Sequence, residues 1–117
     1  MKFICLGFLD EANWNEMAEA ERESFMERCF AYDDELRKGG HFLSGEALQS
    51  IQNAATVRYR GGKVVVTDGP FAETKEVFAG YYIFDLENLD AAIEVAARVP
   101  AVRLGGSVEV RPLLTGD

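Results

Sequence analysis

A strand-like stretch that is apolar on both faces, residues 77–84, most constrains how this chain can fold. Side chains alternate between the two faces of a strand, so neither face here is polar. On one face lie Val77, Ala79, Tyr81 and Ile83, and on the other lie Phe78, Gly80, Tyr82 and Phe84. An antiparallel sheet with one face in water would alternate apolar and polar residues instead. Residues 3–9, the first expected strand, are also apolar on both sides.

Two helices of the expected size can cover only one face of such a sheet. A second apolar face left in water is an interaction site or an aggregation hazard. We therefore expect a homodimer in which two copies pack sheet against sheet around a two-fold axis. The alternative is that loops, the long helix or an inserted hairpin cover that face within one chain.

Hydrophobic periodicity and turn residues predict the element order β-α-β-β-β-β-α-β within a single domain spanning residues 1–117. A long amphipathic helix begins at a capping box of Asn13 and Glu16, is broken near residues 21–24, and ends at Gly39-Gly40. A second helix is capped by Asn88 or Asp90, with Leu89, Ile93, Ala96 and Ala97 on one face. The expected strands are residues 3–9, 41–48, 55–60, 63–67, 77–86 and 107–114.

Two of these strands flank Gly61-Gly62, which is typical of a β-hairpin. With that hairpin counted as an insertion, the order reduces to the split βαβ arrangement of a ferredoxin-like α+β fold. Pro112 suggests that the last strand lies at a sheet edge.

Charge excludes several classes of partner. Twelve Lys and Arg against twenty Asp and Glu give a net charge of −8, which argues against direct binding to nucleic acid or to an anionic membrane. No segment approaches the roughly 20 apolar residues of a membrane span. Cys5 and Cys29 form no CxxC pair, so we expect a reduced, cytoplasmic protein with no metal site and no cofactor.

Candidate site residues centre on Asp68, expected as an acid/base group in the segment Asp68-Gly69-Pro70-Phe71. The alternative is that this segment is only a turn. His41, the single histidine, is a second catalytic candidate, or else a structural residue at a strand start. The expected ligand-binding residues are Arg58 as an anion clamp, Glu46 in the same cleft, and Phe71, Tyr81 and Tyr82 as apolar walls. Salt bridges explain Arg58 equally well.

Residues 66–76 (Val-Thr-Asp-Gly-Pro-Phe-Ala-Glu-Thr-Lys-Glu), followed by Ala79-Gly80-Tyr81-Tyr82, resemble the signature of DGPF-domain proteins in the YCII-related superfamily. The resemblance covers nearly the whole chain. It implies a ferredoxin-like chain that pairs as in dimeric α+β barrels, and a site near Asp68. Relatives are mostly uncharacterised bacterial proteins, often encoded near, or fused to, extracytoplasmic-function sigma factors.

The wider superfamily has been suggested to be enzymatic, through likeness to a chlorohydroxyhydroquinone dehydrochlorinase and a proposed His-Asp pair. That histidine would fall near Cys29, where this chain has none, so the pair does not carry over. Two functions remain as hypotheses. The chain binds or transforms a small anionic or aromatic molecule near Asp68, or it is a regulatory module that acts with a sigma factor. A third reading makes the Asp68 loop purely architectural.

Overall fold

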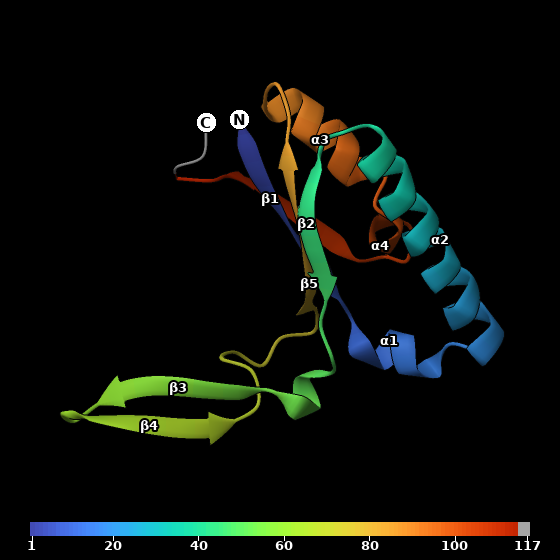
Figure 1. The fold of residues 1–117 in the computed structure, drawn as a ribbon. Helices are drawn as coiled ribbons and strands as arrows, with labels where there is room; N and C mark the ends of the chain where they lie inside the picture. The colour runs from blue at the N-terminus through green and yellow to red at the C-terminus, as the bar shows by residue number, and fades with distance from the viewer. Residues whose placement is uncertain (115–117) are drawn as a thin grey trace.

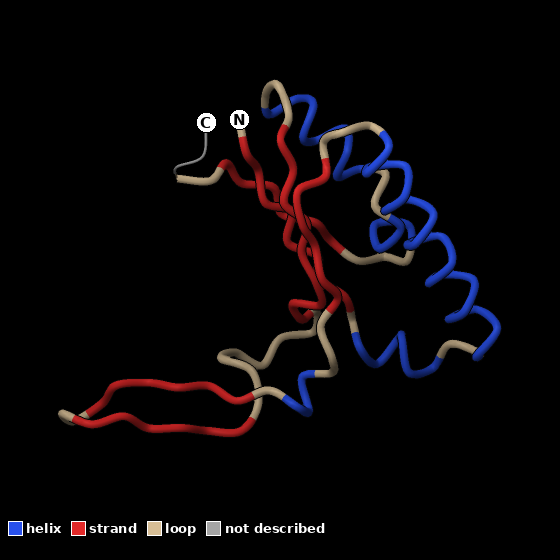
Figure 2. Tube along the Cα trace, viewed as in Figure 1, coloured by secondary structure: helices blue, strands red, loops and turns tan. Residues whose placement is uncertain are grey.

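The computed structural model describes residues 1–114 as a four-stranded sheet with helices on one side and a separate two-stranded hairpin (Figures 1 and 2). The four-stranded sheet has the order β2-β5-β1-β6, and every neighbouring pair is antiparallel. The strands are β1 (Lys2–Leu9), β2 (Phe42–Ala47), β3 (Ala55–Arg60), β4 (Lys63–Asp68), β5 (Val77–Asp85) and β6 (Ser107–Pro112). The helices are α1 (Glu11–Glu16), α2 (Glu19–Lys38), α3 (Leu89–Ala97) and α4 (Pro100–Arg103), with a 3₁₀ turn at Ile51–Asn53.

This strand order confirms the ferredoxin-like α+β prediction. With hairpin β3–β4 set aside, the chain runs β1, helix, β2, β5, helix, β6, and the first strand lies between β5 and β6. Strand β6 is an edge strand, as Pro112 predicted. Within residues 1–114, no helix is both long enough and apolar enough to cross a bilayer.

The start of the helical region differs from the prediction. Asp10, rather than Asn13, caps α1, and its Oδ1 accepts from the backbone N–H of Ala12 at 3.0 Å. The break lies at Met17 and Ala18, whose backbones are extended, and not at residues 21–24. This break turns the chain so that Trp14 of α1 packs edge-on against Phe25 of α2, with ring centroids 5.5 Å apart.

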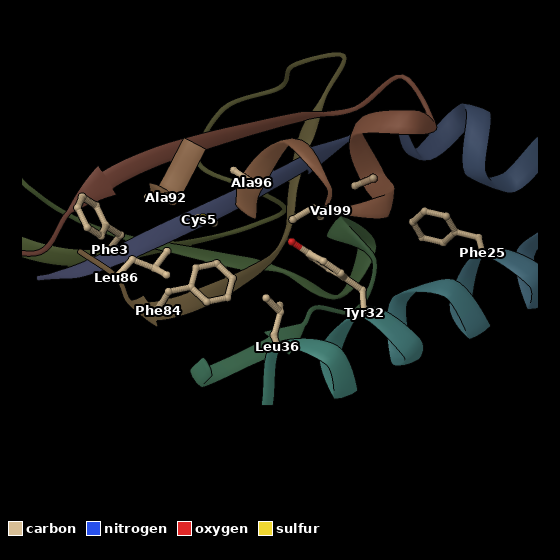
Figure 3. Close-up of a cluster of buried hydrophobic side chains, with 11 residues drawn as sticks. Phe3, Cys5, Phe25, Tyr32, Leu36, Phe84, Leu86, Ala92, Ala96 and Val99 are labelled. Atoms are coloured by element: carbon tan, nitrogen blue, oxygen red, sulfur yellow. The ribbon is translucent and has the colours of Figure 1, made fainter. Parts of the chain in front are cut away.

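The core lies between the sheet and the helices (Figure 3). Phe3, Cys5 and Phe84 of the two central strands are almost completely buried. Helix α3 packs through the small residues Ala92 and Ala96, which allow close approach to the sheet. Leu89 and Ile93 are about half exposed, and they line one hollow together with Ala96 and Ala97, so these four residues share one side of α3 as predicted.

The opposite side of the sheet, which we call the open face, carries none of the helices of residues 1–114 (Figure 1). Strand register places Ile83 beside Ile4, and Tyr81 beside Leu6, along its centre. The flanking positions are polar, with Glu46 opposite Tyr81 on one side and Glu109 opposite Leu6 on the other. The hairpin does not fold over this face but projects away from it (Figure 1). The alternative that an inserted hairpin covers the second face of the sheet within one chain is therefore wrong.

Hairpin β3–β4 is a separate ladder that runs from Ala55 opposite Asp68 to Arg60 opposite Lys63. Gly61 and Gly62 form its two-residue turn with φ of +59° and +79°, which suits the twist of a hairpin and favours glycine. The projecting hairpin makes the molecule unusually extended. Its radius of gyration is 16.0 Å, whereas a compact chain of this length has about 13 Å.

Candidate functional site

A groove of about 550 Å³ lies at the elbow where the sheet meets the root of the hairpin. Three parts of the chain build it: the facing ends of β1 and β5, the segment 48–54, and the loop 69–76 that follows β4. Most of its lining is apolar, including three phenylalanines. The lining residues are Phe8, Leu48, Gln49, Ser50, Ile51, Asn53, Ala54, Pro70, Phe71, Ala72, Thr74, Glu76, Val77 and Phe78.

A β-bulge brings two of these rings together. The register of β1 against β5 shifts after Gly7, so that Gly7 faces Gly80 but Phe8 faces Phe78, and Ala79 is the extra residue. The rings of Phe8 and Phe78 then lie 5.8 Å apart between centroids. The bulge also moves Phe78 to the open face and turns Val77, which is buried, to the opposite side of the strand. The strict alternation predicted for residues 77–84 is therefore wrong at Val77 and Phe78.

The loop 69–76 is held to the hairpin root by hydrogen bonds. The N–H of Gly69 donates to the Ala54 carbonyl at 2.8 Å, and the Thr56 hydroxyl donates to the Gly69 carbonyl at 2.8 Å. Gly69 has φ of +95°, which makes a side chain there strained. Arg58 Nη2 donates to the Phe71 carbonyl at 3.0 Å. These contacts fix the loop while the Phe71 ring stays exposed in the groove.

The opposite wall, residues 48–54, is anchored by Glu11 at the start of α1. Its carboxylate accepts from the Ser50 hydroxyl at 3.0 Å and from the Ile51 N–H at 2.9 Å. Ser50 also caps the 3₁₀ turn by accepting from the Gln52 N–H at 3.1 Å. Both walls of the groove are therefore held by defined hydrogen bonds rather than by apolar contact alone.

Glu76 is the one charged side chain among the lining residues described. Its Oε1 accepts from the Ser107 hydroxyl at 2.8 Å, and the residue is partly buried. Gln49, Ser50, Asn53 and Thr74 supply neutral polar groups. The groove thus combines aromatic walls with hydrogen-bonding groups and one carboxylate, and it has no cation in its described lining.

The structure does not bring Asp68 and Arg58 together. Strand register places Asp68 opposite Ala55, on the hairpin face shared with Val57, whereas Arg58 lies on the other face. Arg58 is already engaged, since Nη1 also donates to the Thr67 hydroxyl at 3.2 Å. Of the predicted site residues, Phe71 alone lines the groove.

Tyr81 and Tyr82 face opposite sides of the sheet. Tyr81 lies on the open face beside Glu46, so these two predicted residues are neighbours. Tyr82 lies under α2, where its hydroxyl donates to Asp33 Oδ1 at 2.6 Å. Burial, and then the hydrogen bond and charge of Asp33, raise the pKa of Tyr82 well above its usual value. Tyr82 therefore ties the helix to the sheet rather than lining a pocket.

His41 lies at the other end of β2 from the groove wall at Leu48. Its Nδ1 is 3.1 Å from the Asp85 carbonyl oxygen, and the residue is exposed. The two cysteines are thiols that burial makes unreactive, because it raises the pKa of each, Cys5 and Cys29, to about 11. Within the described residues, no group of three or more His, Cys, Asp or Glu side chains is placed to hold a metal ion.

Sequence reasoning missed most of the groove. The sequence offers Glu76, together with Asp68 and Glu73, either as a general base or ligand holder or as part of a solvated charged run, and it assigns Phe8, Ile51 and Phe78 to no site. The glycines Gly7 and Gly80, which face one another at the bulge, are the one sequence signal that marks this end of the sheet.

Three comparisons place the chain among known proteins. It is 34% identical over 114 residues to an uncharacterised protein, R00369, from Rhizobium meliloti strain 1021, covering 97% of this chain and 92% of that protein. Its fold is similar to that of 5-chloro-2-hydroxyhydroquinone dehydrochlorinase from Burkholderia phenoliruptrix AC1100, solved with 2,5-dihydroxybenzoquinone, at a TM-score of 0.57 and 14% identity over 99% of this chain and 96% of that one. The family model of the YCII-related domain matches residues 1–115, and the chain therefore belongs to the YCII-related family.

Proposed function

We propose that this protein binds a small, uncharged aromatic molecule that carries hydrogen-bond donors, in the groove at the elbow. The observation that carries this proposal is that Phe8, Phe71 and Phe78, from two strands and a loop, line one groove together with Glu76, the one charged residue of its described lining. Apolar walls with a few convergent polar groups are the usual composition of a small-molecule site. Aromatic rings stack favourably against such walls.

The charge of the groove favours an uncharged ligand over an anionic one. The carboxylate of Glu76 repels an anion, and Arg58, the expected anion clamp, already donates to Phe71 and Thr67. A ligand hydroxyl can donate to the Glu76 carboxylate in a charge-assisted hydrogen bond. We therefore propose Glu76, in place of Asp68, as the group that accepts a hydrogen bond or a proton from the bound molecule.

The structural relative supports a small-molecule function in general terms. That dehydrochlorinase was solved with 2,5-dihydroxybenzoquinone, a small oxygenated ring compound, which supports a small cyclic ligand without supporting its aromaticity or its lack of charge. At 14% identity, the likeness concerns the fold, so the groove itself supplies the argument for ligand class. We place the protein in the cytoplasm, a proposal supported by its two free thiols.

The test is a comparison of matched phenols and benzoates, such as hydroquinone and 4-hydroxybenzoate, by ¹H–¹⁵N NMR titration of the protein. Binding predicts saturable shifts of the amides near Phe8, Phe71 and Phe78 with the phenols, and smaller shifts or none with the benzoates. A clear preference for benzoates contradicts the proposed ligand class. No saturable shift with either series contradicts a small-molecule site in this groove.

Glu76→Gln tests the proposed acceptor, and Glu73→Gln is its matched control. Both residues lie in the loop 69–76 and both changes remove one negative charge, but only Glu76 lines the groove. We expect Glu76→Gln to weaken phenol binding about tenfold, in line with loss of a charge-assisted hydrogen bond. Equal affinities for the two variants would remove Glu76 from the site.

A further inference from the structure

We propose that hairpin β3–β4 is an arm that packs against a second copy of this chain. Beyond Asp68 at its root, one face of the arm is apolar and exposed to solvent. Strand register pairs Val57 with Val66 and Tyr59 with Val64 on this face, and each of the four side chains is more than 60% exposed. We call these four residues the arm face.

Within residues 1–114, hydrogen bonds hold the arm to the rest of its chain only near its root, where Ala54, Thr56 and Arg58 bond to the residues that follow β4. Beyond that point its ladder pairs with itself. A two-stranded hairpin is marginally stable in water unless another surface packs on it. Four adjacent β-branched and aromatic side chains in water are also an aggregation hazard. The arm face therefore needs a partner surface.

Charge favours a second copy as that partner. Residues 55–68 carry Arg58, Arg60 and Lys63 against Asp68, a formal charge of +2, which leaves −10 for the rest of a chain whose total is −8. Arg58, Arg60 and Lys63 lie on the hairpin face opposite the arm face. The net charge of the arm therefore attracts the acidic body of another copy at a distance rather than through ion pairs in the apolar contact. In a two-fold dimer each arm packs against the other copy, so the dimer contains two attractions between a positive arm and an acidic body.

The area of the contact also favours a second copy as the partner of the arm. Figure 1 shows the arm projecting from the side of the sheet that bears the open face. From strand spacing and rise, the 29 residues of β1, β2, β5 and β6 cover roughly 450 Å² in projection, and the 12 residues of β3 and β4 add roughly 200 Å². The arm therefore enlarges the flat area offered to a second copy by about two fifths. Stable interfaces bury about 800 Å² of accessible surface on each partner, and the added area brings the contact closer to that size.

The arm face supplies a necessary part of this contact, in addition to any pairing of the two sheets. The contact does not depend on a ligand in the groove.

The test measures self-association by sedimentation velocity from about 1 to about 100 µM at physiological salt. The variant Tyr59→Asp with Val64→Asp places two charges on the arm face. The control, Arg60→Ala with Lys63→Ala, makes the same change of net charge at the adjacent pair on the other hairpin face. We expect a wild-type dimer, at least about tenfold weaker association in the first variant, and a smaller, salt-dependent change in the control.

A monomeric wild type over this range overturns the proposal, and so does a first variant that associates as tightly as the wild type. Equal weakening in both variants also overturns it, because net charge rather than the arm face would then be responsible. Hydrogen exchange of the wild type gives a second readout that needs no substitution. Amides of residues 57–66 should become more protected as the protein concentration rises, and unchanged protection contradicts the arm.

Discussion

The guanidinium of Arg58 donates through Nη2 to the main-chain carbonyl of Phe71 at 3.0 Å. Arg58, which the sequence suggested as an anion clamp, therefore holds the loop 69–76 in place, and this loop carries the Phe71 ring that lines the groove. The same side chain reaches Thr67 Oγ1 at 3.2 Å, so it links strand β3 to the end of β4 and to the loop. Arg58 is a positioning residue in this account.

Replacing Arg58 with Gln should loosen the loop without unfolding the protein. The side chain is partly exposed, so we expect a loss of about 1 kcal/mol in the free energy of unfolding or less. Faster hydrogen exchange at the amides of residues 70–76 would report the loosened loop. Arg60→Gln is the control, because Arg60 lies on the same hairpin face two pairs closer to the turn. Equal exchange rates in the two variants would mean that Arg58 does not position the loop.

Gly45 should tolerate no side chain. A Cβ at this position would come within 2.6 Å of Tyr82 Cδ1 and 2.8 Å of the Tyr81 carbonyl oxygen. We expect Gly45→Ala to lower the free energy of unfolding by about 1–3 kcal/mol, measured by urea denaturation. Gly7→Ala is the control, because its nearest neighbour, the Gly80 carbonyl oxygen, would be at an ordinary 3.5 Å. Equal effects of the two substitutions would argue against the close packing of Tyr82 over β2.

The protein should lose stability at alkaline pH. Burial raises the pKa of the Cys5 thiol from 9.0 to about 11, so the folded state keeps its proton after the unfolded chain has lost it. The contribution of this thiol to the free energy of unfolding is therefore fully present below pH 9, and it is lost as the pH rises from 9 to 11. Cys29 adds to the same window, because burial and then the charge of Asp33 also raise its pKa to about 11.

Urea unfolding between pH 7 and about pH 11 measures this loss. Cys29→Ala removes one of the two thiols, so its stability should fall less steeply than that of the wild type across the window. A variant curve parallel to the wild-type curve over this range would show that Cys29 does not contribute.

The elements of this fold could be predicted because their signals are local. Each signal acts on the backbone next to it. Examples are the two glycines at the hairpin turn, Asn88 at the start of α3, and Gly39-Gly40 at the end of α2. The β-bulge at Ala79 could not be predicted, because it depends on the register of β1 against β5 and changes no local preference. That single extra residue decides which face Phe78 takes.

The site could be predicted only in part. The sequence singled out Phe71 and its loop, and the structure places Phe71 in the groove. The sequence alone could not show that Asp68 and Arg58 lie on opposite faces of the hairpin, because their placement depends on the pairing register of β3 and β4. Nor could it show that Glu11 anchors the opposite wall through Ile51, a contact between residues forty positions apart.

The most direct test of the groove is a phenol titration of Phe71→Ala beside Phe30→Ala, followed by NMR. Both rings are more than half exposed, so both truncations should leave the fold intact, but Phe71 lines the groove and Phe30 lies on α2. We expect Phe71→Ala to weaken hydroquinone binding about tenfold or more and Phe30→Ala to leave it unchanged. Equal affinities of wild type and Phe71→Ala for hydroquinone would contradict the groove as the binding site.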